Sequence, residues 1–358
     1  MALPFFNGTR KKRDQMLAMD LGSRITKVVH LQRLGQGFAL CGYALLDAPI
    51  FEKTLSPEML AEHLKAVTQA LNAKTRFVTL TMGVDDALVR HSEMPRLQND
   101  DLRAVLKHNS RAYLQQELSG YVYDCHVIPP DPQAKPVQLP PNTAAGPQKQ
   151  TVLVTGAKKQ LVDDLVAGAK SAGLVVDYIV PGLIGPVNAF ERAMPAEFAN
   201  EVVALVDLGF RHSTICVLNR GELGLSRVVN IGGDKLTQSL VAALNISYAE
   251  AEGIKIGMPA EILNDLESQV VPLGRELRAS IDFFEHQHDR PVTQIFMTGG
   301  ATRSPVILQI LQRELLVDCK VLNPTNLMQL SLPPQQAAEI EQVATQLTVA
   351  LGAAMAAL

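Results

Sequence analysis

An internal duplication begins with Met16-Leu17-Ala18-Met19-Asp20-Leu21-Gly22, an apolar run that ends in Asp-Leu-Gly. The pattern returns as Ala204-Leu205-Val206-Asp207-Leu208-Gly209, which places the second aspartate 187 positions after the first. In both copies a few polar residues, a second apolar stretch, a glycine-containing turn and a third apolar stretch follow. Short apolar runs separated by such turns are typical of strands paired in hairpins. The repeat therefore predicts two related lobes.

Predicted helices and strands alternate through the rest of the chain. Pro57–Leu71 has apolar residues at helical spacing, and the apolar run Phe77–Met82 after it predicts a strand. The same alternation predicts further helices over 102–118, 158–172, 235–244, 248–255, 273–286 and 304–316, strands over 151–155, 175–180 and 295–298, and one final helix over 335–358. Strands that alternate with helices indicate an α/β protein.

Composition and charge argue against several classes of protein. Lys+Arg 33 against Asp+Glu 36 gives a net charge of −3, which disfavours a nucleic-acid partner held by phosphate neutralisation. The four cysteines are scattered without a Cys-x-x-Cys pair, so we expect neither a disulfide framework nor a thiolate zinc site. The longest apolar run, Val349 to Leu358, is half the length of ~20 residues that a membrane-spanning helix needs. We therefore expect a cytoplasmic protein.

The duplicated Asp-Leu-Gly has the chemistry of a phosphate and metal site. An aspartate at a strand end can face a cleft between the lobes, and the glycine after it lets backbone N–H groups approach a phosphate closely. Two facing hairpins would grip one polyphosphate from both sides. Asp20 and Asp207 would then hold a hydrated Mg²⁺, which takes few protein carboxylates and keeps several waters. A single copy is more simply a turn that ends a strand, but two copies in matching context favour the site.

A third glycine-containing junction lies at Ile295–Arg303, which predicts a strand, the pair Gly299-Gly300 and then a helix. A flat ring or a phosphate can lie against bare backbone at such a helix N-terminus. Arg303 would be in a position to stack on a base. The alternative is that Gly-Gly is an ordinary strand-to-helix turn and that Arg303 is simply exposed.

The order of these motifs resembles that of the actin-like ATPase superfamily, which includes actin, the Hsp70 chaperones, the sugar kinases and the bacterial division protein FtsA. The two Asp-Leu-Gly hairpins are similar to its two phosphate motifs, and Gly-Gly-Ala-Thr-Arg at 299–303 is similar to its adenosine motif. The segment 249–255 resembles the helix whose Glu and Lys contact ribose and base, here Glu252 and Lys255. Ile231–Asp234 resembles the glycine pair that precedes the outer subdomain of the second lobe.

The resemblance implies ATP and Mg²⁺ as cofactors and an actin-like (ribonuclease H-like) two-lobed fold with a subdomain inserted in the first lobe. Asp20 and Asp207 would hold the Mg²⁺ through waters. The nucleotide-binding residues that it implies are Asp20, Gly22, Ser23, Arg24, Lys27, Asp207, Gly209, Gly232, Gly233, Glu252, Lys255, Gly299, Gly300, Ala301 and Arg303. The domains that we expect are a basic tail over 1–14, a first-lobe core over 15–85 and 156–199, an inserted subdomain over 86–155 with a proline-rich loop over 129–150, a second lobe over 200–332, and a C-terminal helix over 333–358 that returns to the first lobe.

Within the superfamily the sequence most closely resembles the PilM family, cytoplasmic actin-like proteins of type IV pilus assembly. The similarity runs from the first hairpin to the C-terminus, and the segments 153–190, 278–284, 321–324 and 349–354 carry it. Proteins of this family capture the short cytoplasmic N-terminal peptide of a bitopic inner-membrane protein, PilN or an equivalent, beside the inserted subdomain. The resemblance implies such a partner and recruitment to the inner face of the inner membrane, and homo-oligomer formation stays open.

The second hairpin departs from hydrolytic members of the superfamily, which have small residues after the second Asp-Leu-Gly. Phe210 and Arg211 are bulky and would crowd a γ-phosphate unless they turn away, and His212 stands where hydrolytic relatives place a threonine near the attacking water. The connecting segment 181–186 lacks the carboxylate that chaperone-type relatives use to position that water. Since phosphoryl transfer depends on positioning and charge stabilisation, we expect nucleotide binding with slow or absent hydrolysis, at most a weak ATPase.

Three alternatives stay open. An FtsA-like division factor shares several motifs, but FtsA-like chains continue through a linker to an amphipathic membrane helix, whereas this sequence ends at Leu358. An actin-like component of a type II secretion platform differs from the pilus protein only in its partner. A small-molecule kinase of the same fold needs a catalytic carboxylate and a polar sugar pocket, for which we find no motif. The pilus scaffold is the hypothesis that these observations favour.

Overall fold

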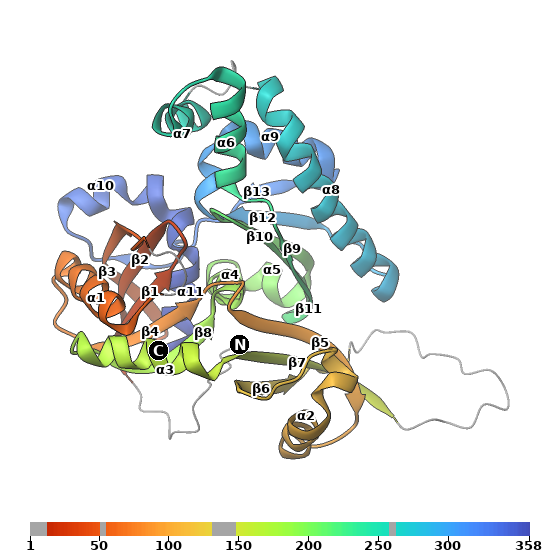
Figure 1. Cartoon of the computed structure of the whole chain (residues 1–358). Coiled ribbons are helices and arrows are strands. Elements are labelled where there is room, and N and C mark those ends of the chain that lie inside the picture. The colour runs from red at the N-terminus through yellow and green to blue at the C-terminus, as the bar shows by residue number, and fades with distance from the viewer. Residues whose placement is uncertain (1–12, 51–54, 131–147, 258–262) are drawn as a thin grey trace.

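The computed structural model describes residues 13–50, 55–130, 148–257 and 263–358. The predicted basic tail, apart from residues 13 and 14, and most of the predicted proline-rich loop over 129–150 lie outside the described residues. The chain forms two large sheets and one smaller sheet, with helices packed around them (Figure 1). This mixture of sheets and helices confirms the predicted α/β class.

The first lobe is built on a six-stranded sheet with the order β14-β3-β2-β1-β4-β8. Its strands are β1 (Gln15–Leu21), β2 (Ile25–Leu34), β3 (Gly37–Asp47), β4 (Phe77–Met82), β8 (Val175–Pro181) and β14 (Gln329–Leu330). Successive side chains of a strand point to opposite faces, so Leu17 and Met19 of β1 pack on one face and Ala18 packs on the other. The helices that cover these two faces are α1 (Pro57–Leu71) and α3 (Lys159–Ser171) on the first and α11 (Thr348–Ala357) on the second.

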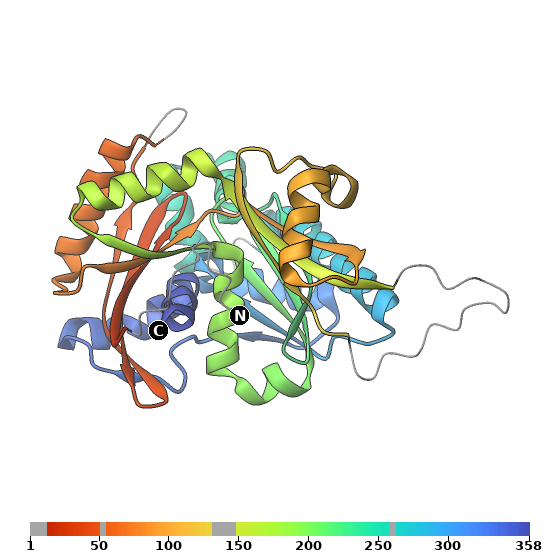
Figure 2. The ribbon, with the colours of Figure 1, turned by 90° about the horizontal axis from the view of Figure 1, so that it is seen from below.

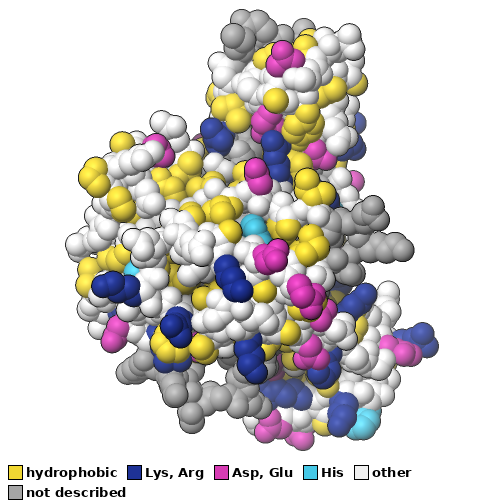
Figure 3. Space-filling view, turned by 60° about the vertical axis from the view of Figure 1, so that its left-hand side comes forward, with side chains coloured by type: hydrophobic (Ala, Val, Ile, Leu, Met, Phe, Trp, Pro, Cys, Tyr) yellow, Lys and Arg dark blue, Asp and Glu magenta, His cyan; other side chains and the backbone are white. Residues whose placement is uncertain are grey.

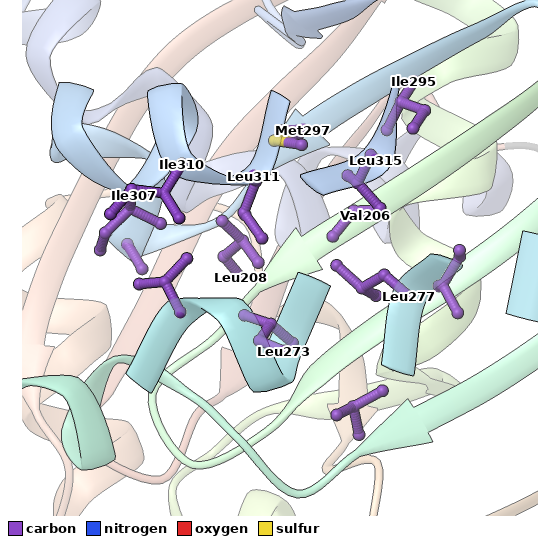
Figure 4. Close-up of a cluster of buried hydrophobic side chains, with 14 of the residues drawn as sticks. Val206, Leu208, Leu273, Leu277, Ile295, Met297, Ile307, Ile310, Leu311 and Leu315 are labelled. Carbon is purple, nitrogen blue, oxygen red and sulfur yellow. The ribbon is translucent and has the colours of Figure 1, made fainter. Parts of the chain in front are cut away.

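The second lobe is built on a five-stranded sheet with the order β11-β10-β9-β12-β13. Its strands are β9 (Val202–Leu208), β10 (Ser213–Asn219), β11 (Glu222–Val229), β12 (Gln294–Thr298) and β13 (Cys319–Val321). Val206 and Leu208 of β9 pack on one face against α8 and α9 (Figure 4), and Val203 and Leu205 pack on the other face against α4. The helices around this sheet are α4 (Gly185–Ala193), α5 (Pro195–Asn200), α6 (Gly233–Leu244), α7 (Tyr248–Gly257), α8 (Leu263–His288) and α9 (Pro305–Leu315).

The two large sheets repeat one arrangement. The strand that carries Asp20, β1, lies antiparallel to β2 and parallel to β4. The strand that carries Asp207, β9, likewise lies antiparallel to β10 and parallel to β12. This correspondence confirms that the sequence duplication reflects two related lobes.

A smaller sheet is inserted between β4 and α3 of the first lobe, in the order β5-β7-β6. Its elements are β5 (Ala87–Pro95), α2 (Asn99–Leu114), β6 (Tyr121–Val127) and β7 (Lys149–Lys158). The buried Leu102 and Leu106 of α2 pack against this sheet. Nε2 of His91 in β5 lies 2.8 Å from the carbonyl oxygen of Leu223 in β11, and this contact connects the inserted sheet to the second lobe. Figure 2 shows the ribbon of the inserted sheet and α2 from below.

The C-terminal segment is not the single helix that we predicted over 333–358. It consists of α10 (Pro334–Val343), a 3₁₀ turn over Ala344–Leu347 and α11. The carbonyl of Thr345 accepts hydrogen bonds from the backbone N–H of Gly299, at 3.1 Å, and from the hydroxyl of Thr298, at 3.0 Å. The helix is interrupted where this carbonyl bonds to the second lobe, and α11 then packs on the first lobe.

The surface seen from the side of the first lobe carries charges of both signs interspersed with apolar side chains (Figure 3). This face shows no large area of a single charge sign, in agreement with the small net charge of the chain. Within the described ranges, no helix combines the length and the apolar composition needed to span a bilayer.

Candidate functional site

Asp20 is held at the end of β1 by the two neighbouring strands. Lys27 of β2 lies opposite Asp20 in register, and its Nζ is 2.9 Å from Asp20 Oδ2. Thr81 of β4 lies beside Asp20 in register and donates from Oγ1 to Asp20 Oδ1 at 3.1 Å. Both oxygens of this carboxylate therefore have fixed partners within the first lobe.

Asp207 lies at the equivalent end of β9. The ammonium group of Lys27 interacts electrostatically with Asp207 as well as with Asp20. Burial raises the pKa of Asp207 to about 6; the ammonium of Lys27 opposes this rise, and the carboxylate of Asp20 adds to it. Burial by itself would lower the pKa of Lys27, but its interactions with Asp20 and then with Asp207 outweigh burial and raise that pKa. The structure thus brings both predicted aspartates around one ammonium group where the lobes meet.

The glycines after the two aspartates make the same tight turn. A Cβ on Gly22 would lie 2.5 Å from the carbonyl oxygen of Ile25, and a Cβ on Gly209 would lie 2.7 Å from that of His212. Real Cβ atoms essentially never approach other atoms within 3.0 Å, so neither turn can take a side chain without a shift. Each loop therefore presents bare backbone next to its aspartate, as a phosphate-binding loop requires.

The predicted Gly232-Gly233 pair begins α6 directly beside the second of these loops. The N–H of Gly233 donates to the carbonyl oxygen of Gly209 at 2.9 Å, and the N–H of Asp234 donates to that of Phe210 at 2.8 Å. These two hydrogen bonds fix the N-terminus of α6 next to Asp207's loop. The positive end of the helix dipole then lies beside the glycine turn, an arrangement that suits an anion.

Three predicted motifs that are far apart in the sequence meet at Gly233. A Cβ on Gly233 would lie 3.6 Å from both the Cβ of Ala301 and the Nζ of Lys255. Gly299, two residues before Ala301, has φ +92°, a left-handed conformation that favours glycine. Its neighbour Thr298 pairs in register with Asp207. The segment 299–303, which resembles the adenosine motif of the superfamily, therefore lies beside Asp207.

Glu252 and Lys255 form a polar cluster with Thr237, a residue that we did not predict. Nζ of Lys255, whose side chain is 3% exposed, lies 2.7 Å from Glu252 Oε2 and 2.7 Å from Thr237 Oγ1. The Thr237 hydroxyl donates to Glu252 Oε2 at 2.6 Å. Burial by itself would raise the pKa of Glu252, but Lys255 and the hydrogen bonds lower it, so the carboxylate stays charged. Thr237 lies one helical turn after Gly233, and that spacing is the signal that could have revealed it.

Arg24 extends from the first loop to the second lobe. Its NH1 donates to Tyr248 Oη at 3.1 Å and lies 3.7 Å from Glu252 Oε2. Its guanidinium carbon lies 5.1 Å from the ring centroids of Phe210 and Tyr248. Phe210, which we expected to crowd a γ-phosphate unless it turned away, therefore packs near Arg24. Tyr248 is a second residue of this region that the sequence motifs did not reveal.

His212 makes another contact between the lobes. Its Nε2 lies 2.6 Å from Oδ2 of Asp85, which follows β4 in the first lobe. The sequence indicates His212 only as a replacement for a threonine, and no sequence motif includes Asp85. The structure therefore assigns the histidine a partner across the junction.

Three predicted residues lie at the border of the site. Ser23, Gly300 and Arg303 are exposed. Within the part of the chain that the structure describes, neither Ser23 nor Arg303 has a side-chain hydrogen bond or ion pair. The predicted nucleotide-binding roles of Ser23, Gly300 and Arg303 therefore stay predictions.

Two lobes with the same strand order, each with an Asp-Leu-Gly hairpin at their junction, define an actin-like protein. The chain belongs to the type IV pilus assembly protein PilM family, whose model matches residues 18–358. This match confirms the resemblance that the sequence motifs predicted.

Two solved structures show the same fold. The PilM–PilN type IV pilus biogenesis complex has a TM-score of 0.80 and 20% identity, over 96% of this chain and 98% of that one. Ethanolamine utilization protein EutJ from Carboxydothermus hydrogenoformans has a TM-score of 0.56 and 14% identity, over 97% and 91% of the two chains.

The cell division protein FtsA of Bacillus subtilis (strain 168) is a relative by sequence. It is 32% identical over 103 residues, which make up 29% of this chain. The match spans only 22% of the length of FtsA, about a fifth of that protein.

Proposed function

We propose that this chain is an ATP-binding actin-like scaffold of type IV pilus assembly that docks the cytoplasmic N-terminal peptide of a PilN-like inner-membrane protein. The nucleotide part of the proposal rests on the convergence of Asp20 and Asp207 on Lys27. The partner part is supported by membership of the PilM family and by likeness to a complex that contains PilN.

The residues of the junction fit a magnesium nucleotide. Asp20 and Asp207 would hold a hydrated Mg²⁺, which neutralises phosphate charge when it is bound. Lys27 would contact phosphate oxygens, and the turns at Gly22 and Gly209 would offer backbone that no Cβ obstructs. Within the described ranges no group of three or more His, Cys, Asp or Glu side chains could hold a metal ion. Two aspartates with waters therefore suit Mg²⁺ better than they suit a zinc-type metal.

Glu252, Lys255, Ala301 and the left-handed Gly299 would receive the nucleoside. Glu252 stays charged and can accept from ribose hydroxyls, while Gly299 and Ala301 offer a small, flat surface against the base. Lys255 is nearly buried, so we propose that it positions Glu252 and that its contact with the nucleotide is limited. We also propose that the domains have the boundaries that the sequence predicts.

We propose slow or absent hydrolysis. His212 contacts Asp85, and the connecting segment 181–186 has no carboxylate to position a water. A measurement of phosphate release under MgATP saturation tests this. Turnover near or above roughly 1 s⁻¹, the low end of common enzyme rates, would contradict it.

Affinity capture from a native membrane extract tests the scaffold role. Full-length tagged chain and the Asp207→Ala variant are compared with and without MgATP, and the captured proteins are identified by mass spectrometry. Recovery of a PilN-like bitopic protein by the wild type supports the proposal, and a weaker recovery by the variant shows that nucleotide controls docking. A PilN-like protein absent from every sample would contradict it.

The match to FtsA supports a second candidate, a division factor that recruits tubulin-like filaments. The same capture distinguishes the two functions, because a tubulin-like protein in place of a PilN-like protein would favour the division role.

A further inference from the structure

Arg24 links the loop after Gly22 in the first lobe to α7 of the second lobe. It lies two residues after Gly22, and its side-chain hydrogen bond and ion pair are both with residues of α7, Tyr248 and Glu252. The rings of Phe210 and Tyr248 lie at 5.1 Å from its guanidinium carbon, within the range of a cation–π contact. One side chain of the first lobe is thus held by three side chains of the second.

The contact with Glu252 is weak enough to be exchanged. The two charged groups are 3.7 Å apart, and their side chains are 36% and 28% exposed, which are the properties of an ion pair of small net stability. Glu252 also keeps Lys255 and Thr237 as closer partners, at 2.7 Å and 2.6 Å. If Arg24 moved away, Glu252 would therefore remain paired.

A phosphate is the stronger partner for this guanidinium. Tyr248 occupies only NH1 of Arg24, whereas guanidinium has five N–H donors in a fixed fork. That fork matches two phosphate oxygens at once, a bidentate geometry that Lys cannot reproduce. Because Arg24 belongs to the same loop as Gly22, a polyphosphate bound by that loop would be close to its side chain.

We propose that Arg24 is a phosphate-sensitive clasp between the lobes. The inference rests on the proposed nucleotide site and adds a regulation to it. Bound polyphosphate takes the guanidinium from Tyr248 and Glu252, which releases α7 from the first lobe. Adenosine, which has no phosphate, leaves the clasp closed.

Hydrogen–deuterium exchange on the full chain tests the clasp without nucleotide. We expect Arg24→Ala to raise exchange over 248–257, and to leave exchange over 305–315 in α9 unchanged. Arg24→Lys keeps the charge and a donor but not the fork, so it should restore more of this protection than of the MgATP affinity. Unchanged exchange over 248–257 in Arg24→Ala would overturn the clasp.

Binding measurements test the exchange of partners. We expect Arg24→Ala to weaken MgATP binding by about 10-fold or more and to change adenosine binding by less than about 2-fold. Tyr248→Phe should not weaken MgATP binding, although it removes the 2.8 Å hydrogen bond to Asp234 Oδ1 together with the competing partner. Equal losses for MgATP and adenosine in Arg24→Ala would show a purely structural role and overturn the inference. A wild type that does not bind MgATP would overturn the proposed function itself, whereas wild-type binding that Arg24→Ala leaves intact would overturn the inference alone.

Discussion

Gly185 of α4 and Gly352 of α11 contact each other through their backbones where the two helices cross. A Cβ on Gly352 would lie 2.7 Å from the carbonyl carbon of Gly185, and a Cβ on Gly185 would lie 2.7 Å from the Cα of Val349. α4 packs under the second-lobe sheet, and α11 packs under the first-lobe sheet. Their crossing therefore joins the cores of the two lobes.

Gly352→Ala should destabilise the protein at this crossing. The added methyl group has no room beside Gly185, and overpacking of this kind costs about 1–3 kcal/mol of unfolding free energy. Gly253→Ala in α7 is the matched control: its Cβ meets no atom within 4 Å, and alanine favours a helix by about 0.5–1 kcal/mol. The midpoint temperature of thermal unfolding should therefore fall in Gly352→Ala and rise in Gly253→Ala. A Gly352→Ala midpoint at or above that of the wild type would contradict the crossing.

Lys27→Met should weaken both nucleotide binding and the native state. It removes the cation that both Asp20 and Asp207 face, so the two carboxylates repel each other without compensation. We expect MgATP affinity to fall by about 10-fold or more and unfolding free energy to fall by about 1–3 kcal/mol. Lys65→Met, on the exposed face of α1, is the control and should change neither quantity. Calorimetric titration and urea unfolding measure the two effects, and similar results for both variants would refute this assignment.

The raised pKa of Asp207 predicts a pH dependence of nucleotide binding. Burial raises this pKa to about 6, so the carboxylate loses its charge as the pH falls through 6. The ratio of MgATP affinities between the wild type and Asp207→Asn should therefore shrink between pH 7 and pH 5. Titration of ATP itself affects both proteins equally and cancels in the ratio. A ratio that does not change with pH would contradict the assignment.

The sign of the stability effect follows from the same shift. The folded state holds this proton more tightly than the unfolded state, whose aspartate has its ordinary pKa near 4. The contribution of Asp207 to stability therefore falls as the pH rises from about 4 to about 6, and the ionised group carries a constant cost above that range.

Thr237→Val should weaken the polar cluster around Lys255. Valine keeps the shape but removes a hydroxyl that lies 2.7 Å from the nearly buried ammonium and donates to Glu252. Loss of such a buried partner costs about 1–3 kcal/mol. Thr68→Val is the control, because among the residues that the structure describes the Thr68 hydroxyl bonds only to the carbonyl of Leu64 in its own helix. Equal unfolding midpoints for the two variants would show that Thr237 has no special role.

Much of the fold could be predicted because the duplicated pattern is local. The apolar run before each Asp-Leu-Gly forms a central strand whose alternate side chains enter two cores, and a period of two residues is visible in any sequence. The same pattern placed Asp20 and Asp207 at equivalent strand ends, where the structure brings both close to Lys27.

What the sequence did not reveal depends on contacts distant in the chain. α8 continues through Pro272, although we predicted a helix only from 273, because Leu266 and Val270 are fully buried in the second-lobe core. That packing outweighs the low helix propensity of proline. The break in the C-terminal helix has a similar origin, since the Thr345 carbonyl bonds to Thr298 and Gly299.

The missed site residues follow the same rule. None of the three belongs to a motif: Thr237 touches Glu252 within the second lobe, whereas Tyr248 and Asp85 touch Arg24 and His212 across the junction. Tyr248 and Asp85 become visible only when the lobes are placed together.

Calorimetric titration of MgATP into wild-type protein, Asp207→Ala and Asp163→Ala tests the central claim, which is that two aspartates from two lobes hold one magnesium nucleotide. Asp163 is an exposed aspartate of α3 paired with Lys159, so its variant should bind within about 2-fold of the wild type. We predict that Asp207→Ala binds MgATP about 10-fold or more weakly. The same affinity in all three proteins would contradict the two-aspartate site.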